Sequence, residues 1–479
     1  MKRLFFVLTL ILLAGCQRQD PVSAPVDDLR PAKSSILPGR AVVLLSEQAA
    51  DGADFSAVTQ QLGIRSAERI FPEAGEFEAR HRAAGLHRWY RICYDETVPA
   101  TKAEAELGGL PGVEAVQTPR RIKQRGYFND IHYELQWDLE NDGTMTKSFK
   151  KGIDINVRPV WEEFTAGSSE VIVAVIDGGI DLQHEDLQGV VLPAGESGSK
   201  TFIDGYAPYK IQAESHGTHV AGIIGAVSNN QIGVAGIAGG SNGQGGVRLM
   251  SCAIFATSGK EMIDGDDAAA LVWAADHGAV IMNCSWGYVA RSESQARRTA
   301  QQFNSTSSAL RSAIDYFIAN AGLDARGRQT GPMAGGVIFF ASGNDGYRYG
   351  TPASYEPVIA VGAFGPDGKM ARFSNYGDWV DLLAPGGSDS SSRAQEWVLS
   401  TVPTNNYAFM PGTSMASPHA AGVAALIVSY FGGQGFTNTM LKRAMINGSD
   451  PNAINRQGRA AGGKLDALGS FNYLLNNGR

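Results

Sequence analysis

Three polar side chains whose types could perform nucleophilic catalysis stand beside apolar segments. Asp177 follows the apolar run 171–176, His216 precedes a stretch of small residues with helical character, and Ser414 precedes a long apolar stretch. A serine hydroxyl is a weak nucleophile at neutral pH, so an imidazole must take its proton and an anion must hold the tautomer of that imidazole. A carboxylate next to an apolar run is costly unless such a partner pairs with it. These three residues therefore form a candidate catalytic set.

The segments that would position these residues alternate between strands and helices. From about residue 133 onward, this alternation predicts a mostly parallel sheet with helices on both faces. The expected strands comprise residues 171–176, 248–254, 279–282, 337–341 and 358–361. In such sheets, ligands bind beyond the carboxyl ends of the strands. Since Asp177, Ser285 and Asn344 all follow a predicted strand, we expect them at one edge of the sheet.

Four segments resemble the subtilisin-like serine proteases, the subtilases. They comprise residues 175–180, 216–222, 341–344 and 412–419. The order Asp, His, Ser along the chain is also that of the family, and the resemblance extends over residues 133–475. It implies a subtilisin-like three-layer α/β fold with a mostly parallel sheet between helices. It also implies a serine endopeptidase that cleaves polypeptides through an acyl-enzyme, with Asp177, His216 and Ser414 as its triad.

The resemblance assigns further residues to the substrate cleft. The side-chain amide of Asn344 and the backbone N–H of Ser414 are implied donors to the oxyanion, and residues 351–353 resemble one wall of the cleft. The other implied substrate-binding residues are Ser285, Trp286, Gly287 and Gly343. Trp286 fits either a subsite that favours apolar side chains or a place in the core. Residues 288–331 exceed a minimal subtilase and form either a surface excursion or part of the cleft.

No cofactor is needed for this chemistry, but the resemblance implies a structural calcium ion. Asp186 stands where family members place a calcium-binding carboxylate, and residues 228–234 resemble the calcium loop. Oxygen ligands of this kind suit a hard cation. The loop leaves the choice between Asn229 and Asn230 as ligand open, and Gln136 is a further candidate. A simple polar turn is the alternative.

The first 16 residues have the pattern of an export signal. Lys2 and Arg3 precede the apolar run 4–13, which is too short to span a membrane. Residues 13–16 resemble the lipobox of bacterial lipoproteins, which predicts a signal peptide over residues 1–16 and a lipidated Cys16. The alternative is a plain secretory signal with an incidental cysteine. We expect an exported protein anchored to the cell envelope, at the outer membrane if the host has one.

Two segments separate this signal from the expected catalytic domain. Residues 17–39 are polar and rich in proline, which predicts a tether. Residues 40–120 have the strand and helix order of the ferredoxin-like propeptide of the family, which implies a small α+β domain that inhibits the enzyme in its precursor. An unrelated binding domain is the alternative. Cleavage near residues 120–126 would leave a catalytic domain within residues 121–479 and release it from the anchor, unless the propeptide stays bound.

The charge composition argues against nucleic acid as a partner. The net charge of −7, from 41 basic and 48 acidic residues, provides no basic surface for nucleic acid.

His219 and His419 lie in the catalytic motifs, but the family assigns them no proton transfer, so we expect them to be structural. Cys252 and Cys284 lie in apolar runs and are expected to be buried thiols, with a disulfide between them as the alternative.

Two other functions compete with peptide hydrolysis. An esterase could use the same three residues, but Ala416 stands where the esterase motif has glycine, and the triad order differs from that of esterases. A surface binding protein on an inactive protease scaffold is the third possibility. All four positions expected to act in catalysis are filled, which disfavours it.

Overall fold

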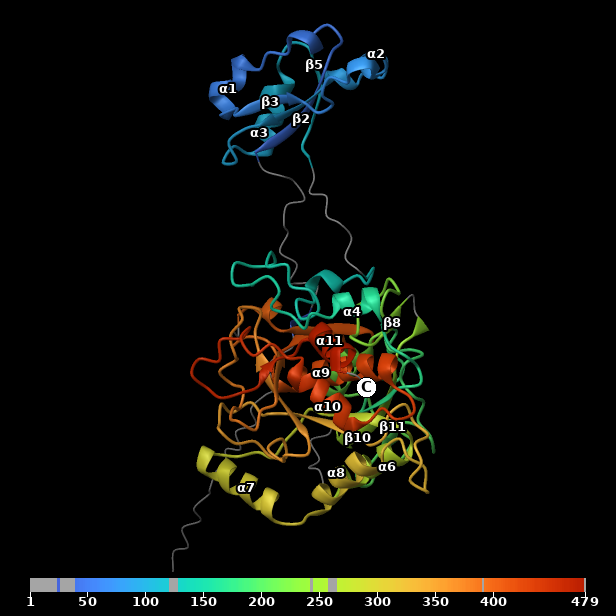
Figure 1. Ribbon diagram of the computed structural model, residues 1–479. Helices are drawn as coiled ribbons and strands as arrows, with labels where there is room; N and C mark the ends of the chain where they lie inside the picture. Colours follow the sequence, from blue (N-terminus) through green and yellow to red (C-terminus); the bar gives the residue numbers. More distant parts are fainter. Residues whose placement is uncertain are drawn as a thin grey trace, which may run out of the picture. The chain divides into compact units, whose positions relative to one another are not determined.

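The computed structural model describes residues 24–25, 39–119, 128–241, 244–256, 265–389 and 392–477. Its contacts divide the chain into a small unit, residues 30–125, and a large unit, residues 1–29 and 126–479 (Figure 1). The predicted signal peptide with Cys16, all of the tether except residues 24, 25 and 39, and the expected cleavage segment lie outside the described residues. Within the described ranges, no helix has the length and apolar character needed to cross a membrane.

The small unit is an antiparallel sheet covered by helices. The strands lie in the order β3-β4-β2-β5, and the chain order of strands and longer helices is that of a ferredoxin-like unit, with α2 added between β3 and β4. The elements are β2 (Arg40–Leu45), α1 (Ser56–Leu62), β3 (Ser66–Arg69), α2 (Glu78–Ala83), β4 (Trp89–Cys93), α3 (Ala100–Gly108) and β5 (Val113–Gln117). Strand β2 alternates between buried and less buried residues, so one of its faces forms the core.

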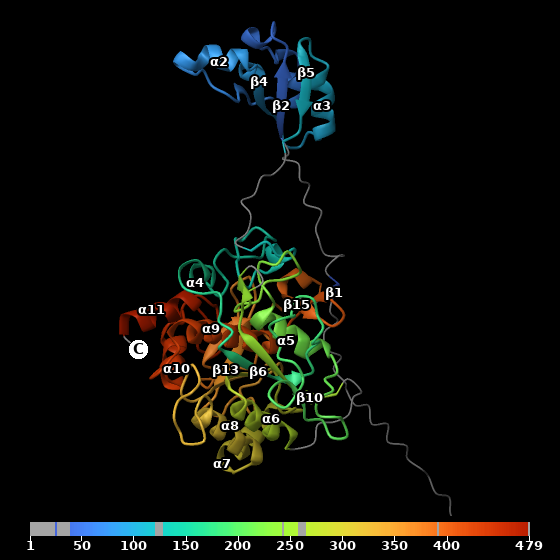
Figure 2. The same cartoon turned by 90° about the vertical axis from the view of Figure 1, so that its right-hand side faces the viewer.

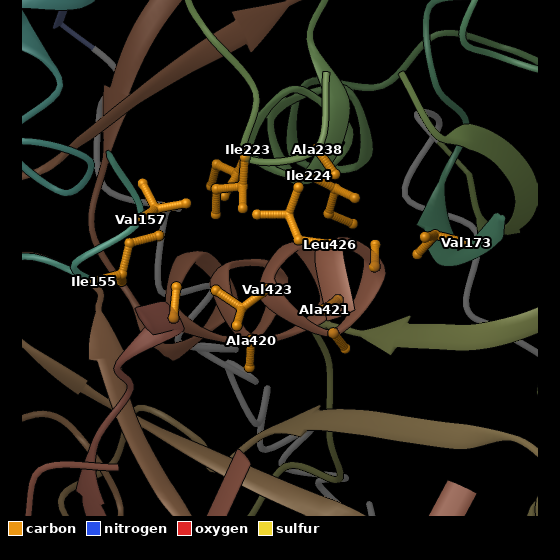
Figure 3. Packing of buried hydrophobic residues seen from close by; sticks show 14 of the residues in the cluster. Ile155, Val157, Val173, Ile223, Ile224, Ala238, Ala420, Ala421, Val423 and Leu426 are labelled. Atoms are coloured by element: carbon orange, nitrogen blue, oxygen red, sulfur yellow. The ribbon is translucent and has the colours of Figure 1, made fainter. Parts of the chain in front are cut away.

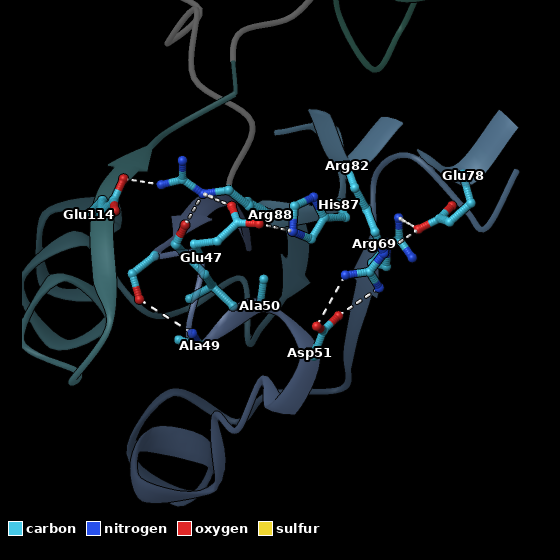
Figure 4. Close-up of polar contacts among 12 residues, drawn as sticks. Glu47, Ala49, Ala50, Asp51, Arg69, Glu78, Arg82, His87, Arg88 and Glu114 are labelled. Carbon is cyan, nitrogen blue, oxygen red and sulfur yellow. Dashed lines mark hydrogen bonds and ion pairs between the residues drawn. The ribbon is translucent and has the colours of Figure 1, made fainter. Parts of the chain in front are cut away.

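The sequence analysis did not predict β3 or α2. β3 is an edge strand without a fully buried residue, and α2 likewise buries no side chain, so neither has an apolar period. Ion pairs hold this region instead (Figure 4): Arg82 Nη2 lies 2.8 Å from Asp51 Oδ1, and Arg69 Nη2 lies 3.1 Å from Glu78 Oε1. The Arg82–Asp51 pair is largely exposed, so solvent screens it and its contribution to stability is small.

The large unit is built on an eight-stranded parallel sheet, as predicted (Figure 2). Its order is β17-β14-β13-β12-β11-β6-β10-β7, and every pairing in it is parallel. The strands are β6 (Ile172–Gly178), β7 (Lys200–Thr201), β10 (Arg248–Phe255), β11 (Ala279–Cys284), β12 (Val337–Ala341), β13 (Ile359–Phe364), β14 (Leu382–Pro385) and β17 (Gly463–Lys464). The five predicted strands are the five longest. The sequence analysis missed β7, β14 and β17, which have four residues or fewer.

Helices cover both faces of this sheet. Successive side chains of a strand point to opposite faces, so Val173 and Val175 of β6 pack in one core cluster while Ala174 and Ile176 pack in another. The first cluster includes α5 (Ser215–Gly225) and α9 (Thr413–Phe431), and the second includes α6 (Asp266–Asp276) and α8 (Ala309–Asn320). The remaining helices are α4 (Arg158–Glu163), α7 (Glu293–Ser305), α10 (Asn438–Asn447) and α11 (Ala467–Asn477).

Helices α5 and α9 pack against each other through buried apolar side chains. Ile223 and Ile224 of α5 face Val423 and Leu426 of α9 in the same buried cluster (Figure 3). On another side of α5, a Cβ on Gly222 would lie 2.3 Å from Ser400 Oγ, so only glycine allows the close approach of α5 to the segment 398–402. Since His216 and Ser414 stand in the first turns of these two helices, their packing sets where both side chains lie.

A separate small sheet supports α5. It is an antiparallel hairpin of β15 (Val398–Val402) and β16 (Asn406–Met410), and β1 (Ala24–Pro25) from the predicted tether pairs with β16. The hydroxyl of Ser400 donates to the carbonyl of His219 at 2.7 Å, and that of Thr401 donates to the carbonyl of Thr218 at 2.8 Å. The short hairpin of β8 (Gly240–Ser241) and β9 (Gln244–Gly245) lies elsewhere in the unit.

Truncating the α9 core should destabilise the large unit. Leu426 is fully buried, and Leu426→Ala should lower the free energy of unfolding by about 2–5 kcal/mol through lost burial and the cavity left behind. Leu475→Ala in α11, where the side chain is 50% exposed, is the control and should change it by less than about 1 kcal/mol. Urea unfolding measures both. Equal, small effects would show that the α5–α9 core is not closely packed.

Candidate active site

Asp177 lies near the carboxyl end of β6, within the strand rather than after it. Its side chain is 1% exposed, and Oδ1 accepts hydrogen bonds from His216 Nδ1 at 2.8 Å and from the Gly178 N–H at 2.7 Å. A buried carboxylate is stable only with such partners. The strand therefore presents an anion at the sheet edge that is already joined to an imidazole.

His216 is held by the first turn of α5. Glu214 caps this helix, because its carboxylate accepts the N–H of Gly217 at 3.0 Å. The ring donates from Nδ1 to Asp177, so in the neutral imidazole Nε2 carries the lone pair. The side chain is 28% exposed. His216 is therefore oriented as a base that can accept a proton from the solvent side.

Ser414 is held at the start of α9 by an exchange of hydrogen bonds with Ser285. Pro418 has no N–H and so cannot donate to the carbonyl of Ser414 four residues earlier. The Ser285 hydroxyl donates to that carbonyl at 2.7 Å, and the Ser414 hydroxyl donates to the Ser285 carbonyl at 3.1 Å. Asn283, buried in β11, donates to the Ser285 hydroxyl at 2.9 Å.

Strand register brings Ser414 to the edge that holds Asp177. Strands β11 and β6 are neighbours, with Asn283 opposite Val175, so residue 285 stands level with residue 177. Adjacent strands are about 4.8 Å apart, and Ser414 is hydrogen-bonded to Ser285. The three residues expected to form the triad therefore converge on one edge of the sheet.

The side chain of Asn344 has a fixed orientation beside Ser414. Its Oδ1 accepts hydrogen bonds from the N–H of Thr413 at 2.9 Å and from the Thr413 hydroxyl at 2.8 Å. The amide NH₂ is thus the end left to face the pocket that Asn344 and Ser414 both line. Sequence reasoning missed Thr413, because only the folded structure shows which amide atom it engages.

A pocket of about 610 Å³ opens next to these groups. All four residues predicted to bind substrate, Ser285, Trp286, Gly287 and Gly343, line it. Residues 288–291, together with Ala296 and Thr299 of α7, line it too. The first part of the insert, residues 288–299, therefore contributes to the pocket wall, whereas residues 300–331 do not line it.

Trp286 packs against the core and also lines the pocket, so it combines the two alternatives that the sequence left open. Its Nε1 donates to the carbonyl of Ile176 at 2.9 Å, and its ring packs edge-on against Phe340 with centroids 5.2 Å apart. The side chain is only half-buried and also lines the pocket. Trp286 thus fixes the pocket wall to the sheet. Of the segment 351–353, which resembles the opposite wall, Thr351 lines the pocket.

Comparison with known proteins identifies the family. Residues 168–463, which include the three residues expected to form the triad, match the model of the subtilase family, Peptidase_S8. The chain belongs to the subtilase family.

Two relatives and one solved structure extend this result. The chain is 36% identical over 290 residues to a thermophilic serine proteinase of Bacillus sp. strain AK1, covering 60% of this chain and 58% of that one. It is 32% identical over 416 residues to an extracellular protease of Xanthomonas campestris, covering 78% and 62%. This subtilase thus spans less than two thirds of either relative. A solved protease of Pseudoalteromonas arctica superposes with a TM-score of 0.55 and 25% identity, over 73% of this chain and 99% of that one.

The residues expected to bind calcium gather in one buried cluster of this subtilase. Asp186 is fully buried and accepts hydrogen bonds from Asn230 Nδ2 at 2.8 Å and from the Val234 N–H at 2.9 Å. Asn230 rather than Asn229 therefore faces the carboxylate. Gln136 forms two hydrogen bonds of 2.8 Å with the backbone of Ala235, directly after this loop: its Nε2 donates to the carbonyl and its Oε1 accepts the N–H.

The electrostatics of this cluster suit a cation. Burial, followed by the nearby carboxylates of Asp130 and Glu185, raises the pKa of Asp186 to about 7, against the hydrogen bonds that lower it. Each carboxylate oxygen has more than one lone pair, so an N–H contact still leaves acceptor capacity. Carboxylate and amide oxygens are the ligands that Ca²⁺ prefers. Asp186 therefore suits a calcium ion by ligand type, whereas Asn230 directs its NH₂ toward this carboxylate and its Oδ1 accepts the Ile232 N–H at 2.8 Å.

The two further motif histidines of this subtilase are structural, as predicted. His219 is fully buried, with Nε2 3.0 Å from the carbonyl of Ala408 and 3.2 Å from that of Val398. Burial lowers the pKa of His219 to about 3, so the ring is neutral. His419 is also fully buried, and its Nε2 lies 3.1 Å from Asp138 Oδ2. This contact links α9 to the loop that contains Asp138.

Cys252 and Cys284 are buried free thiols. Cys252 and Cys284 both lie level with Ile176, in the strands on either side of β6. Two strand spacings separate them by about 10 Å, beyond the reach of a disulfide. The disulfide alternative is therefore wrong.

Proposed function

We propose that this protein is a serine endopeptidase that hydrolyses peptide bonds through an acyl-enzyme, with Asp177, His216 and Ser414 as its triad. The single observation that carries the proposal is the 2.8 Å hydrogen bond from His216 Nδ1 to the buried Asp177. It leaves Nε2 as the base on the edge of the sheet where Ser414 stands. The family membership of residues 168–463 supports the same chemistry.

Each step uses a group already held in place. Ser414 Oγ attacks the carbonyl carbon of the substrate while its proton passes to His216 Nε2, and Asp177 stabilises the imidazolium. The proton then moves to the leaving amine as the C–N bond breaks. Water, deprotonated by the same imidazole, then attacks the acyl-enzyme. The imidazolium returns this proton to Ser414 Oγ as the ester C–O bond breaks and the carboxylic acid leaves.

Two hydrogen-bond donors stabilise the oxyanion of both tetrahedral intermediates. They are the Asn344 side-chain NH₂, whose orientation is set by the two Thr413 contacts, and the backbone N–H of Ser414 at the start of α9. The positive end of the helix dipole adds to this field. Such donors contribute because they are oriented before the charge develops.

We also propose that the substrate binds as an extended strand and that apolar side chains are favoured. The pocket is lined by Trp286 and Tyr288, and at its rim Val289 is 88% exposed. Apolar side chains left in water at the rim of a cleft gain most from covering an apolar substrate group. Thr299 and Ala296 of α7 limit the size of the group that enters.

The N-terminal quarter of the chain, residues 1–126, fits export as a precursor. We propose that Cys16 is lipidated, that residues 40–120 are an inhibitory propeptide, and that cleavage near residues 120–126 produces the active catalytic domain. The compact small unit with its ferredoxin-like element order supports this role. The relative from Xanthomonas campestris is named an extracellular protease, which supports export.

We propose finally that calcium binds at Asp186 and Asn230, with Gln136 nearby. The buried carboxylate beside other negative groups supports this assignment. The ion would neutralise these charges and stabilise the loop 228–234, and it takes no part in the proton transfers of catalysis.

A fluorophosphonate probe separates the three functions that this site could serve. The processed protein should cleave casein, and the probe should label Ser414 and abolish cleavage, while Ser414→Ala should neither cleave casein nor take the label. Mass spectrometry of the labelled peptide locates the adduct. Turnover of simple esters without casein cleavage would identify an esterase instead. Neither activity nor labelling would indicate an inactive scaffold and end the proposal.

Asn344→Leu should lower kcat for peptide hydrolysis by about 10²- to 10³-fold, because one oxyanion donor is lost. KM should change by less than about threefold, since the donor acts mainly in the transition state. Asn320→Leu, an exposed asparagine at the end of α8, is the matched control and should leave kcat unchanged. Steady-state kinetics on a chromogenic peptide measures these values. Full turnover of Asn344→Leu would remove this residue from the mechanism.

Chelation should lower the melting temperature by about 5 °C or more, because the folded state loses a ligand that the unfolded chain does not bind. Added Ca²⁺ should restore it, and Asp186→Asn should make the melting temperature insensitive to both additions. Differential scanning calorimetry gives the values. A wild-type melting temperature that is the same in EDTA and in Ca²⁺ would contradict a calcium site.

A further inference from the structure

A third ionisable side chain lies beside the Asp177–His216 pair. One ligand-type atom from each of Asp177, Glu214 and His216 lies within 4.8 Å of the others. Glu214 is partly buried. The mechanism described above gives this carboxyl group no role beyond capping α5.

Close packing holds Glu214 against the strand end that carries Asp177. A Cβ on Gly178 would lie 2.4 Å from Glu214 Oε2, so the carboxyl group rests directly on the glycine. The N–H of Glu214 donates to the carbonyl of Gly179 at 2.7 Å, and Oε2 accepts the N–H of Gly217 at 3.0 Å. With backbone contacts on both sides, the carboxyl group cannot swing into solvent without losing the helix cap.

The site also contains a buried oxygen that no hydrogen bond satisfies. Asp177 Oδ2 is buried and has no hydrogen-bond partner within the described ranges, whereas Oδ1 accepts two. The negative charge of Asp177 is therefore compensated chiefly through one oxygen. A positive charge on His216 would be the favourable counter-charge for both carboxylates.

We propose that Glu214 is a positioning residue of the catalytic site, whose carboxylate acts with Asp177 as a second anion that stabilises the imidazolium form of His216. The inference rests on the proposed function, because the imidazolium is the form that His216 takes while a peptide bond is being broken. Glu214 accepts no proton from substrate and makes no bond to it. It acts only through the charge that it places beside the ring.

The charged groups that face Glu214 come from the two elements packed against it, Asp177 from β6 and His216 from α5. Burial raises the pKa of Glu214, the Gly217 N–H lowers it, the charge of Asp177 raises it and that of His216 lowers it. The neighbouring ring of His219 is neutral and adds no charge. Protonation of His216 and ionisation of Glu214 therefore favour each other.

The direct test is the pKa of His216, measured by NMR titration of its ring protons in a Ser414→Ala background. Glu214→Gln removes the charge but keeps an amide oxygen for the Gly217 N–H. It should lower the pKa of His216 by about 0.5 to 1 unit, as expected for one unit charge within 4.8 Å in a partly hydrated site. In the active enzyme, kcat should fall about two- to tenfold. The acidic limb of the pH profile of kcat should move to lower pH by about the same 0.5 to 1 unit as the pKa of His216. The substrate for this assay is an uncharged peptide.

Two further variants make the outcome decisive. Glu170→Gln removes an equal charge from an exposed site beyond the opposite end of β6, about 20 Å away along the strand, and should leave the pKa unchanged. Glu214→Asp keeps the charge on a shorter side chain and should lower the pKa by less than Glu214→Gln. If Glu214→Gln fails to fold, Glu214→Asp should still lower the pKa relative to the wild type, and an unchanged pKa overturns the inference. A pKa of His216 that Glu214→Gln leaves unchanged or raises, or that both glutamine variants lower equally, overturns the inference. A wild type without peptidase activity would refute the proposed function, whereas the NMR comparison would still decide the role of Glu214.

Discussion

The structure depends on holding a carboxylate in the interior at the end of a strand. Asp177 is almost completely buried, and its charge is tolerated because His216 and the backbone of Gly178 donate to the same oxygen. This arrangement requires α5 to begin within hydrogen-bonding distance of β6. The cap by Glu214, the absence of a side chain on Gly178 and the hairpin that supports α5 all serve that placement.

The proposed nucleophile, Ser414, is placed by an independent set of contacts. Pro418 removes a helical hydrogen bond from the carbonyl of Ser414, and the Ser285 hydroxyl takes its place. Helix α9 is thereby bonded to the end of β11, the strand next to β6. Thr413 in the same turn orients the amide of Asn344. A single helix start thus positions the proposed nucleophile and both proposed oxyanion donors.

Sequence was sufficient for the long buried strands, and it named Asp177 and His216, which a hydrogen bond joins in the structure. The segments before Asp177 and before Asn344 are uninterrupted apolar runs of strand length, and both are strands in the structure. Short edge strands such as β7 and β17 carry no such signal, because each has only two residues. The roles of Thr413 and Glu214, and the α7 wall of the pocket, depend on contacts between segments far apart in sequence or on side-chain direction, which spacing does not encode.

In the proposed mechanism, Ser414 attacks a carbonyl whose oxygen accepts hydrogen bonds from Asn344 and from the backbone N–H of Ser414 itself. The decisive measurement is a crystal structure of the processed protein after reaction with a fluorophosphonate. We expect phosphorus bonded to Ser414 Oγ and its oxygen about 2.7–3.1 Å from both Asn344 Nδ2 and the Ser414 nitrogen, with His216 still hydrogen-bonded to Asp177. An adduct on another residue, or a phosphoryl oxygen directed to solvent with Asn344 turned away, would contradict it.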